Sequence, residues 1–200
     1  MPRRDVILIE AGLVGGVPLE RIRSIFDATG GRARLSTWWQ GAAADRLLDE
    51  RHAALVERVV KLFERRRWET AVEVSFSRFG ERGAIDLLGG LREARAVAVV
   101  EVKSEFGSLE ETNRTLDMKE RLAPSISEER FGFRPSFVGR ILVVPSDDSI
   151  RRVVARHDRT MGSIYPARSH DVRRWLRHPD GPIRAIWFVS EVPQRDPGSG

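Results

Sequence analysis

The chain has no cysteine, a single tyrosine and only three lysines among its 34 basic residues. The absence of cysteine excludes disulfide bonds, thiolate catalysis and zinc sites built from thiolates. No apolar run approaches the ~20 residues that span a bilayer, and no segment resembles a cleavable signal, so we expect a cytoplasmic protein without a membrane partner. The 200 residues suit one domain with a small appendage.

The charge balance indicates polyanionic partners. A net charge of +5 favours nucleic acid or an anionic membrane surface without choosing between them. Of the 34 basic residues, 31 are arginine. The three positions that remain lysine, Lys61, Lys103 and Lys119, are therefore candidates for sites that need a compact ammonium group rather than a planar guanidinium.

Hydrophobic periodicity defines the first elements. Apolar residues recur at helical spacing over residues 45–67, which predicts a long amphipathic helix. Residues 70–77 alternate, with Val72, Val74 and Phe76 on the apolar face of a predicted strand.

Two further strands follow in an antiparallel meander. One carries Asp86, and Gly89-Gly90 begin the turn into the other, at residues 96–103. The remaining predicted elements are a helix from the Ser108 cap to Leu122, a strand at 140–144, helices at 147–160 and 168–177, and a strand at 184–189.

Two carboxylates and a lysine interrupt these apolar strands, where a charge is unfavourable unless it has a partner or a task. Glu101 and Lys103 are two residues apart, so their side chains leave the same face of the strand. The neighbouring strand can set Asp86 beside them. A divalent cation would relieve the repulsion between the carboxylates, and the lysine could position a water or neutralise a phosphate. The alternative is an ordinary hairpin in which Glu101 and Lys103 form an ion pair.

This arrangement resembles the PD-(D/E)xK nuclease superfamily, with Asp86 and Glu101-Val102-Lys103 as the matching residues and Ile85 where the family pattern has proline. The resemblance implies an α/β, restriction-endonuclease-like fold, with an αβββαβ core and a mixed central sheet flanked by helices. It also implies Mg²⁺ (or Mn²⁺) held by Asp86, Glu101 and the backbone carbonyl of Val102. Lys103 would then orient or deprotonate the attacking water.

Members of this superfamily often add polar residues around the site. Lys119 lies on the packing stripe of its predicted helix, where its ammonium either snorkels to solvent or reaches the catalytic cleft. Glu57 is the positional candidate for a metal-associated glutamate on the first helix, although it projects about 160° from the centre of the apolar face. Glu73 is a second candidate metal ligand. His52 falls near the centre of that face, either as a packed core residue or as a phosphate contact or weak metal ligand.

The first forty residues resemble the end of a phage-repressor-like (XRE-type) helix-turn-helix domain, with Ile9-Glu10-Ala11-Gly12 closing a recognition helix and Val17 to Ile22 entering the last helix. The front half of such a domain is missing. The alternative is a strand at Val6–Ile9 and a helix at Leu19–Ala28 within the main domain. Regulators of this type carry C-terminal domains similar to the chain at residues 46–57, 73–77, 80–103 and 115–119.

These resemblances divide the chain into a helix-turn-helix remnant or N-terminal extension at 1–40, a nuclease-like domain at 41–192 and a disordered tail at 193–200. Two functions stay open. One is a Mg²⁺-dependent endonuclease that acts on DNA, with arginines binding phosphates. The other is a non-catalytic, DNA-binding transcriptional regulator that uses the nuclease-like fold for sensing or dimerisation. A homodimer is compatible with both.

Overall fold

The structure, a computed structural model, describes residues 18–29, 42–105 and 107–190. The chain divides into two compact units, with the boundary at Gly41. The strand considered at Val6–Ile9 and the disordered tail expected at 193–200 lie outside the described residues.

In the first unit the structure describes one helix, α2 (Leu19–Ala28). Pro18 precedes it with a φ of −57° and a ψ of 139°, a non-helical conformation, so the helix begins at Leu19. Glu20 lies in the first turn, where a carboxylate interacts favourably with the helix dipole. α2 belongs to a different unit from the sheet, and so is not a helix of the main domain.

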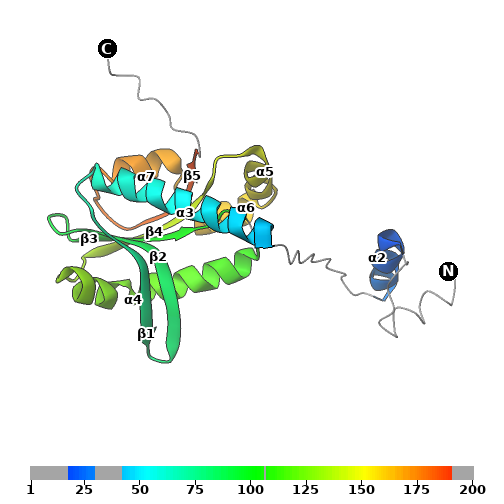
Figure 1. The fold of residues 1–200 in the computed structure, drawn as a ribbon, viewed down its shortest axis with the longest axis horizontal. Coiled ribbons are helices and arrows are strands. Elements are labelled where there is room, and N and C mark those ends of the chain that lie inside the picture. The colour runs from blue at the N-terminus through cyan, green and yellow to red at the C-terminus, as the bar shows by residue number, and fades with distance from the viewer. Residues whose placement is uncertain (1–17, 30–41, 106, 191–200) are drawn as a thin grey trace, which may run out of the picture. The chain divides into compact units, whose positions relative to one another are not determined.

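The second unit is built on a mixed five-stranded sheet with the order β1-β2-β3-β4-β5 (Figure 1). β1, β2 and β3 pair antiparallel, and β3, β4 and β5 pair parallel. The predicted α/β class with a mixed sheet is confirmed, and the order α-β-β-β-α-β runs from α3 to β4. The strands are β1 (Glu69–Arg78), β2 (Glu81–Leu91), β3 (Ala96–Val102), β4 (Phe137–Pro145) and β5 (Ile183–Val189). The helices are α3 (Ala42–Glu64), α4 (Leu109–Phe131), α5 (Asp148–Arg156), α6 (Asp158–Ile164) and α7 (Ser169–Trp175).

Helices cover both faces of this sheet and form two apolar cores. The core under α3 and α7 includes Leu55, Val59, Phe63, Val172 and Trp175. The core under α4, α5 and α6 includes Leu116, Ile126, Ile150, Val154 and Met161. β3 lies between the two cores, and all seven of its residues are buried. A charged side chain on β3 must therefore find its partners within the protein.

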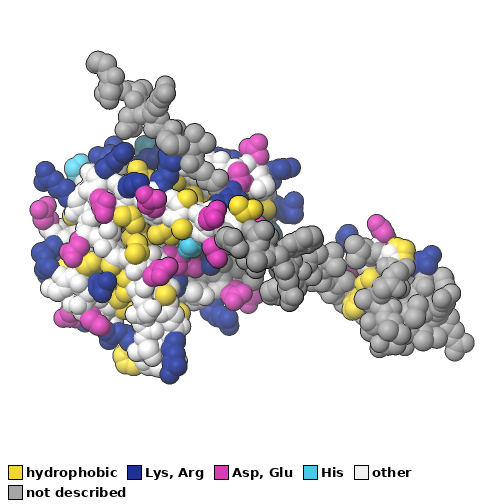
Figure 2. Space-filling model, in the orientation of Figure 1, with side chains coloured by type: hydrophobic (Ala, Val, Ile, Leu, Met, Phe, Trp, Pro, Cys, Tyr) yellow, Lys and Arg dark blue, Asp and Glu magenta, His cyan; other side chains and the backbone are white. Residues whose placement is uncertain are grey.

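The surface of the second unit is mixed in charge. Basic and acidic side chains are interspersed over its visible face, and apolar side chains lie between them (Figure 2). None of the helices in the described ranges is long and apolar enough to cross a bilayer.

The predicted alternation of β1 is wrong at its start. Val74 and Phe76 are buried as predicted, but Val72 is 49% exposed and Ala71 is buried in its place. The cause is Glu73, whose φ of 49° lies in the left-handed region. This conformation reverses the in-and-out alternation of side chains between the two halves of the strand.

Gly89 and Gly90 lie inside β2 and not in the turn that the sequence predicted. Each allows an aromatic ring to pack directly on the strand. A Cβ atom at Gly89 would lie 2.6 Å from the ring of Phe63, and one at Gly90 would lie 2.7 Å from the ring of Phe131. The two glycines are thus a requirement of close packing by α3 on one face and α4 on the other.

Two helices differ from their predicted bounds. α4 begins after the Ser108 cap, whose side chain accepts a hydrogen bond from the backbone N–H of Glu111 at 3.3 Å, as predicted. It continues past Pro124 to Gly132, which ends it with a φ of 69°. Burial of the second half offsets the cost of an internal proline, about 3 kcal/mol. The helix predicted at 147–160 is divided at His157 into α5 and α6.

We predict that Gly89→Ala destabilises the fold by about 1–3 kcal/mol, because the new methyl group overlaps the Phe63 ring, itself fully buried and packed on Trp68. Urea denaturation measures the change. Gly181→Ala is the matched control, since nothing lies within 4 Å of its Cβ position. Equal stability of the two variants would contradict this account of the packing.

Candidate functional site

Asp86 lies where β2 separates from β3. The ladder between these strands runs from Leu87 to Leu91 on β2. β2 also changes faces here, because Ile85 packs in the core under α4 and Leu87 in the core under α3. Oδ2 of Asp86 accepts a hydrogen bond from the backbone N–H of Val102 at 2.7 Å. The end of the ladder therefore sets this carboxylate against the end of β3.

Glu101 is the centre of the cluster and is only 3% exposed. Its Oε1 lies 2.9 Å from Nζ of Lys103. Its Oε2 accepts a hydrogen bond from Nζ of Lys119 on α4, whose side chain is 4% exposed. The same Nζ lies 3.9 Å from Oδ1 of Asp86. The three motif residues and Lys119 therefore meet on the face of the sheet that α4 covers.

The chain balances the charge of this cluster by itself. Two carboxylates face two ammonium groups, and Lys119 contacts Glu101 while facing Asp86. A lysine thus relieves the repulsion that we expected a divalent cation to relieve. Within the described ranges, no group of three or more His, Cys, Asp or Glu side chains is arranged to hold a metal ion. Such a buried network needs every charge compensated, since an unpaired ion in a low-dielectric region is strongly destabilising.

Burial and the charge of Glu101 raise the pKa of Asp86 above its usual value, against the opposing effects of the Val102 N–H, Lys119 and His52. Burial lowers the pKa of Lys103, but the hydrogen bond and charge of Glu101 outweigh it, so the net shift is upward. Lys103 therefore stays cationic at neutral pH, and its side chain is 37% exposed. The site combines a carboxylate that is unfavourably ionised with an ammonium that reaches solvent.

The other predicted residues lie at different distances from this cluster. His52 is half-buried and close enough for its charge to affect the pKa of Asp86. Glu73 and Asp86 both fall in the one gap of the β1–β2 register, and the side chain of Glu73 is exposed. Glu57 is not at the site: it is exposed on α3 and pairs with Lys61 at 2.5 Å. Its helical projection away from the apolar face explains this outcome.

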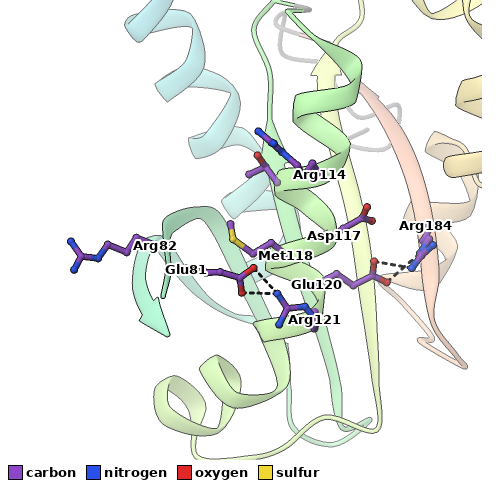
Figure 3. Close-up of a pocket in the computed structure, with 9 residues that line it drawn as sticks. Glu81, Arg82, Arg114, Asp117, Met118, Glu120, Arg121 and Arg184 are labelled. Carbon is purple, nitrogen blue, oxygen red and sulfur yellow. Dashed lines mark hydrogen bonds and ion pairs between the residues drawn. The ribbon is translucent and has the colours of Figure 1, made fainter. Parts of the chain in front are cut away.

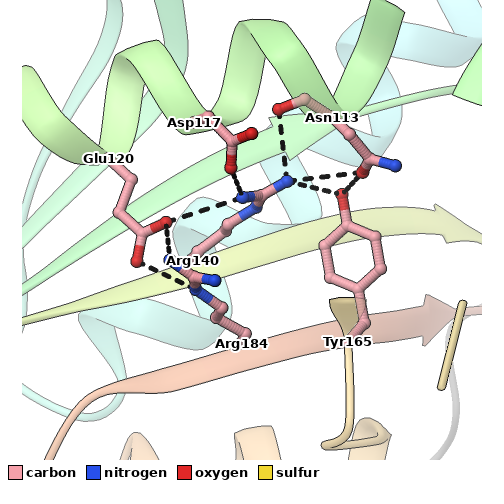
Figure 4. A network of polar contacts seen from close by, with 6 residues as sticks. All are labelled: Asn113, Asp117, Glu120, Arg140, Tyr165 and Arg184. Carbon is pink, nitrogen blue, oxygen red and sulfur yellow. Dashed lines mark hydrogen bonds and ion pairs between the residues drawn. The ribbon is translucent and has the colours of Figure 1, made fainter. Parts of the chain in front are cut away.

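Sequence analysis missed a second buried charge, Arg140, which is 1% exposed in the middle of β4 (Figure 4). Its guanidinium contacts Asp117 of α4 and lies 3.3 Å from the hydroxyl of Tyr165. Asn113 accepts hydrogen bonds from both, at 3.3 Å from Arg140 and at 2.5 Å from the tyrosine hydroxyl. An arginine inside the apolar run of β4 was the signal available in the sequence.

This second network adjoins the carboxylate cluster. Burial raises the pKa of Tyr165, and the charges of Asp117 and Glu101 add to the rise, whereas Arg140 opposes it. The effect of Glu101 shows that the tyrosine lies within electrostatic range of the cluster. Tyr165, the only tyrosine of the chain, is itself fully buried. Arg140 and Tyr165 are both buried, so neither has direct access to a substrate.

An open cleft of about 830 Å³ lies beside the exposed face of α4 and does not include the carboxylate cluster (Figure 3). Its walls are Glu81 and Arg82 of β2, six residues of α4 and Arg184 of β5. Glu81 pairs with Arg121 at 2.5 Å, and Arg184 pairs with Glu120 at 3.0 Å. Most of its charges are thus already matched in pairs. The buried charges of Glu101 and Lys119 lie outside this cleft.

No protein-family model matches the chain, and a comparison with curated proteins found no match.

We predict that Asp86→Asn stabilises the fold at neutral pH, because the amide removes an ionisation that burial and Glu101 oppose. The pKa of Asp86 is raised, so the wild type regains its stability as pH falls toward 3.8, and the advantage of the variant disappears there. Urea denaturation at a series of pH values measures the difference.

Asp171→Asn is the control. Its pKa is lowered, chiefly by the backbone N–H of Arg168, so this variant is destabilised at neutral pH and the loss disappears in acid. A loss of stability in Asp86→Asn at neutral pH would contradict the raised pKa.

Proposed function

We propose that the second unit is a nuclease-like domain of the PD-(D/E)xK, restriction-endonuclease-like type that hydrolyses phosphodiester bonds in DNA with Mg²⁺. The observation that carries the proposal is the meeting of Asp86, Glu101 and Lys103 at the end of β3. Asp86 lies on β2 and Glu101 on β3, adjacent strands of a mixed sheet whose elements follow the order α-β-β-β from α3 to β3. A purely structural role is a poor explanation for this cluster, since apolar residues in its place would give an equally stable core.

The donor set suits a hard cation. Asp86 and Glu101 offer carboxylate oxygens and Val102 offers a backbone carbonyl, which are the ligand types that Mg²⁺ prefers. Lys119 contacts Glu101, so a metal must share or replace this interaction. When bound, the metal would acidify a water and neutralise phosphate charge. Burial of Glu101 demands a counter-cation, and either the lysine or a metal can supply that charge.

Lys103 is the residue placed to act on a substrate. It shares the face of Glu101, which holds its Nζ at 2.9 Å, and more than a third of its side chain is exposed. Its raised pKa keeps the ammonium charged, so it would orient a water or bind a phosphate oxygen and would not act as a base at neutral pH. The structure therefore favours the orienting role of the two roles expected from the family resemblance.

DNA is the proposed substrate because phosphate binding depends on cationic side chains, and the chain has 31 arginines and a net charge of +5. Charges are mixed on the visible face, so binding would rest on individual arginines and not on one broad patch (Figure 2). The resemblance of residues 1–40 to the end of a helix-turn-helix domain points to the same partner.

One observation favours the second function, a DNA-binding regulator that lacks catalysis. Lys119 already compensates the two carboxylates, and the cluster is complete without a metal. In a regulator the network would serve only to hold α4 on the sheet. The two functions differ in one property, which is whether a divalent cation can take the place of the lysine.

We predict that Lys119→Met lowers stability by about 3 kcal/mol in EDTA, because it leaves Glu101 buried beside an uncompensated Asp86. Mg²⁺ or Mn²⁺ should then restore stability, by about 2.7 kcal/mol at 100 times the dissociation constant. The wild type should respond less at the same metal concentration. Thermal unfolding with and without metal measures both effects.

Lys61→Met is the matched control, since Lys61 forms an exposed pair that contributes little to stability and lies away from the cluster. If no divalent cation stabilises Lys119→Met, the proposed metal site is wrong, and the DNA-binding regulator is the function that stays open.

For catalysis, we expect metal-dependent cleavage of linear, nicked or branched DNA that Asp86→Asn abolishes and Glu57→Gln leaves unchanged. Asp86→Asn keeps the shape of the side chain and removes its charge, whereas Glu57 lies outside the site. Intact DNA after incubation of the wild type with Mg²⁺ or Mn²⁺, on every one of these substrates, would contradict the hydrolytic function.

A further inference from the structure

The tip of the β1–β2 hairpin carries a phenylalanine with almost no contacts to the rest of the protein. Phe79 is 89% exposed, more than any other large apolar side chain in the described ranges. Arg78 pairs with Glu81 across the turn, so Phe79 and Gly80 form a two-residue loop. Beyond Asp86 the hairpin no longer pairs with β3, and it extends away from the body of the second unit (Figure 1).

The backbone at this tip is unfavourable for phenylalanine. Phe79 has a φ of 52° and Gly80 a φ of 81°, both in the left-handed region. Two-residue hairpin loops with this conformation strongly favour asparagine followed by glycine, and a bulky residue there is strained. Phe79 thus lowers stability through its backbone and gains almost nothing from burial. A residue that is unfavourable in both respects indicates a task outside the folded chain.

The hairpin that carries this ring also carries two arginines, Arg78 and Arg82. Arg78 pairs with Glu129, and Arg121 pairs with Glu81 at 2.5 Å. Arg82 has no partner among the described residues and supplies the unbalanced positive charge. Figure 2 shows a hydrophobic and a basic side chain together at the end of the hairpin. An exposed aromatic ring and a cation three residues away on the same hairpin match the base and the phosphate of a nucleic-acid strand.

The surroundings of Phe79 argue against a protein partner. The other exposed large apolar residue of the hairpin, Val72, is seven positions away along the strand, and charged residues lie between them. Protein-docking surfaces are contiguous apolar areas of a few hundred Å². A single ring at the end of a projecting hairpin fits instead against an unstacked base.

We propose that Phe79 is a stacking platform for an unpaired base of single-stranded or branched DNA, with Arg82 binding an adjacent phosphate. The inference rests on the proposed function for the identity of its ligand as DNA. The extended strand that leads from the turn to Asp86 runs over residues 81–86, a span of roughly 17 Å. At 3.4 Å per nucleotide of a strand, the stacked base would lie about five nucleotides from the carboxylate cluster.

The test measures binding of a single-stranded oligonucleotide that contains 2-aminopurine, in EDTA and without cleavage, by its fluorescence and by anisotropy. Phe79→Asn should weaken binding roughly 5- to 100-fold, the range expected for one aromatic–base stack. The same variant should unfold at a temperature equal to or above that of the wild type, because asparagine suits the turn. Lower affinity therefore cannot be attributed to a damaged fold.

Two further variants identify the type of contact. Phe79→Trp should keep the affinity and the quenching of 2-aminopurine, whereas Phe79→Leu should lose both. Arg82→Gln should reduce the slope of the logarithm of the binding constant against the logarithm of salt concentration by about one. Phe79→Asn should leave this slope unchanged.

Three results would overturn the inference: equal DNA affinity of Phe79→Asn and the wild type, full affinity of Phe79→Leu, or a dimer in sedimentation equilibrium that Phe79→Asn dissociates. The last two would assign the tip to an apolar partner or to a second copy of the chain. Because the assay contains no metal, Phe79-dependent binding by a protein that cleaves nothing would support this inference while the hydrolytic function fails.

Discussion

The ion pair between Lys119 of α4 and Glu101 of β3 is the interaction on which the site depends. It compensates a carboxylate that has no access to solvent, and the same ammonium faces Asp86. α4 performs a similar task for β4, where Asp117 compensates the buried guanidinium of Arg140. One helix therefore supplies the counter-charges of both central strands. Because unpaired buried ions are strongly destabilising, the position of α4 on the sheet and the charges of the site are determined together.

A single irregularity in the sheet connects the cluster to the hairpin. Glu73 on β1 has a left-handed φ of 49°. β2 changes faces at Asp86, at the same gap in the β1–β2 register. The change turns the carboxylate toward β3 and ends the ladder between β2 and β3. Beyond that point the hairpin extends outward and presents Phe79 to solvent. The carboxylate cluster and the proposed stacking platform are thus two results of one bend.

Periodic features were predictable from the sequence, and long-range compensation was not. The spacing of Glu101 and Lys103 fixed their common face, and the meander brought Asp86 to them, because both follow from the period of a strand. Lys119 compensates the carboxylates because of the way α4 packs on the sheet. No local sequence pattern predicts this packing. The continuation of α4 past Pro124 was also not predictable from local sequence, because burial of its second half overrides the helix-breaking effect of proline.

The most direct test of the central claim is a crystal structure of the protein with Mn²⁺, using anomalous scattering to locate the metal. The account predicts one strong peak bound by oxygens of Asp86 and Glu101, with the Lys119 ammonium moved away from Glu101. Lys119 still hydrogen-bonded to Glu101, with no anomalous peak at the cluster at millimolar Mn²⁺, would contradict the account and identify the network as a purely structural one.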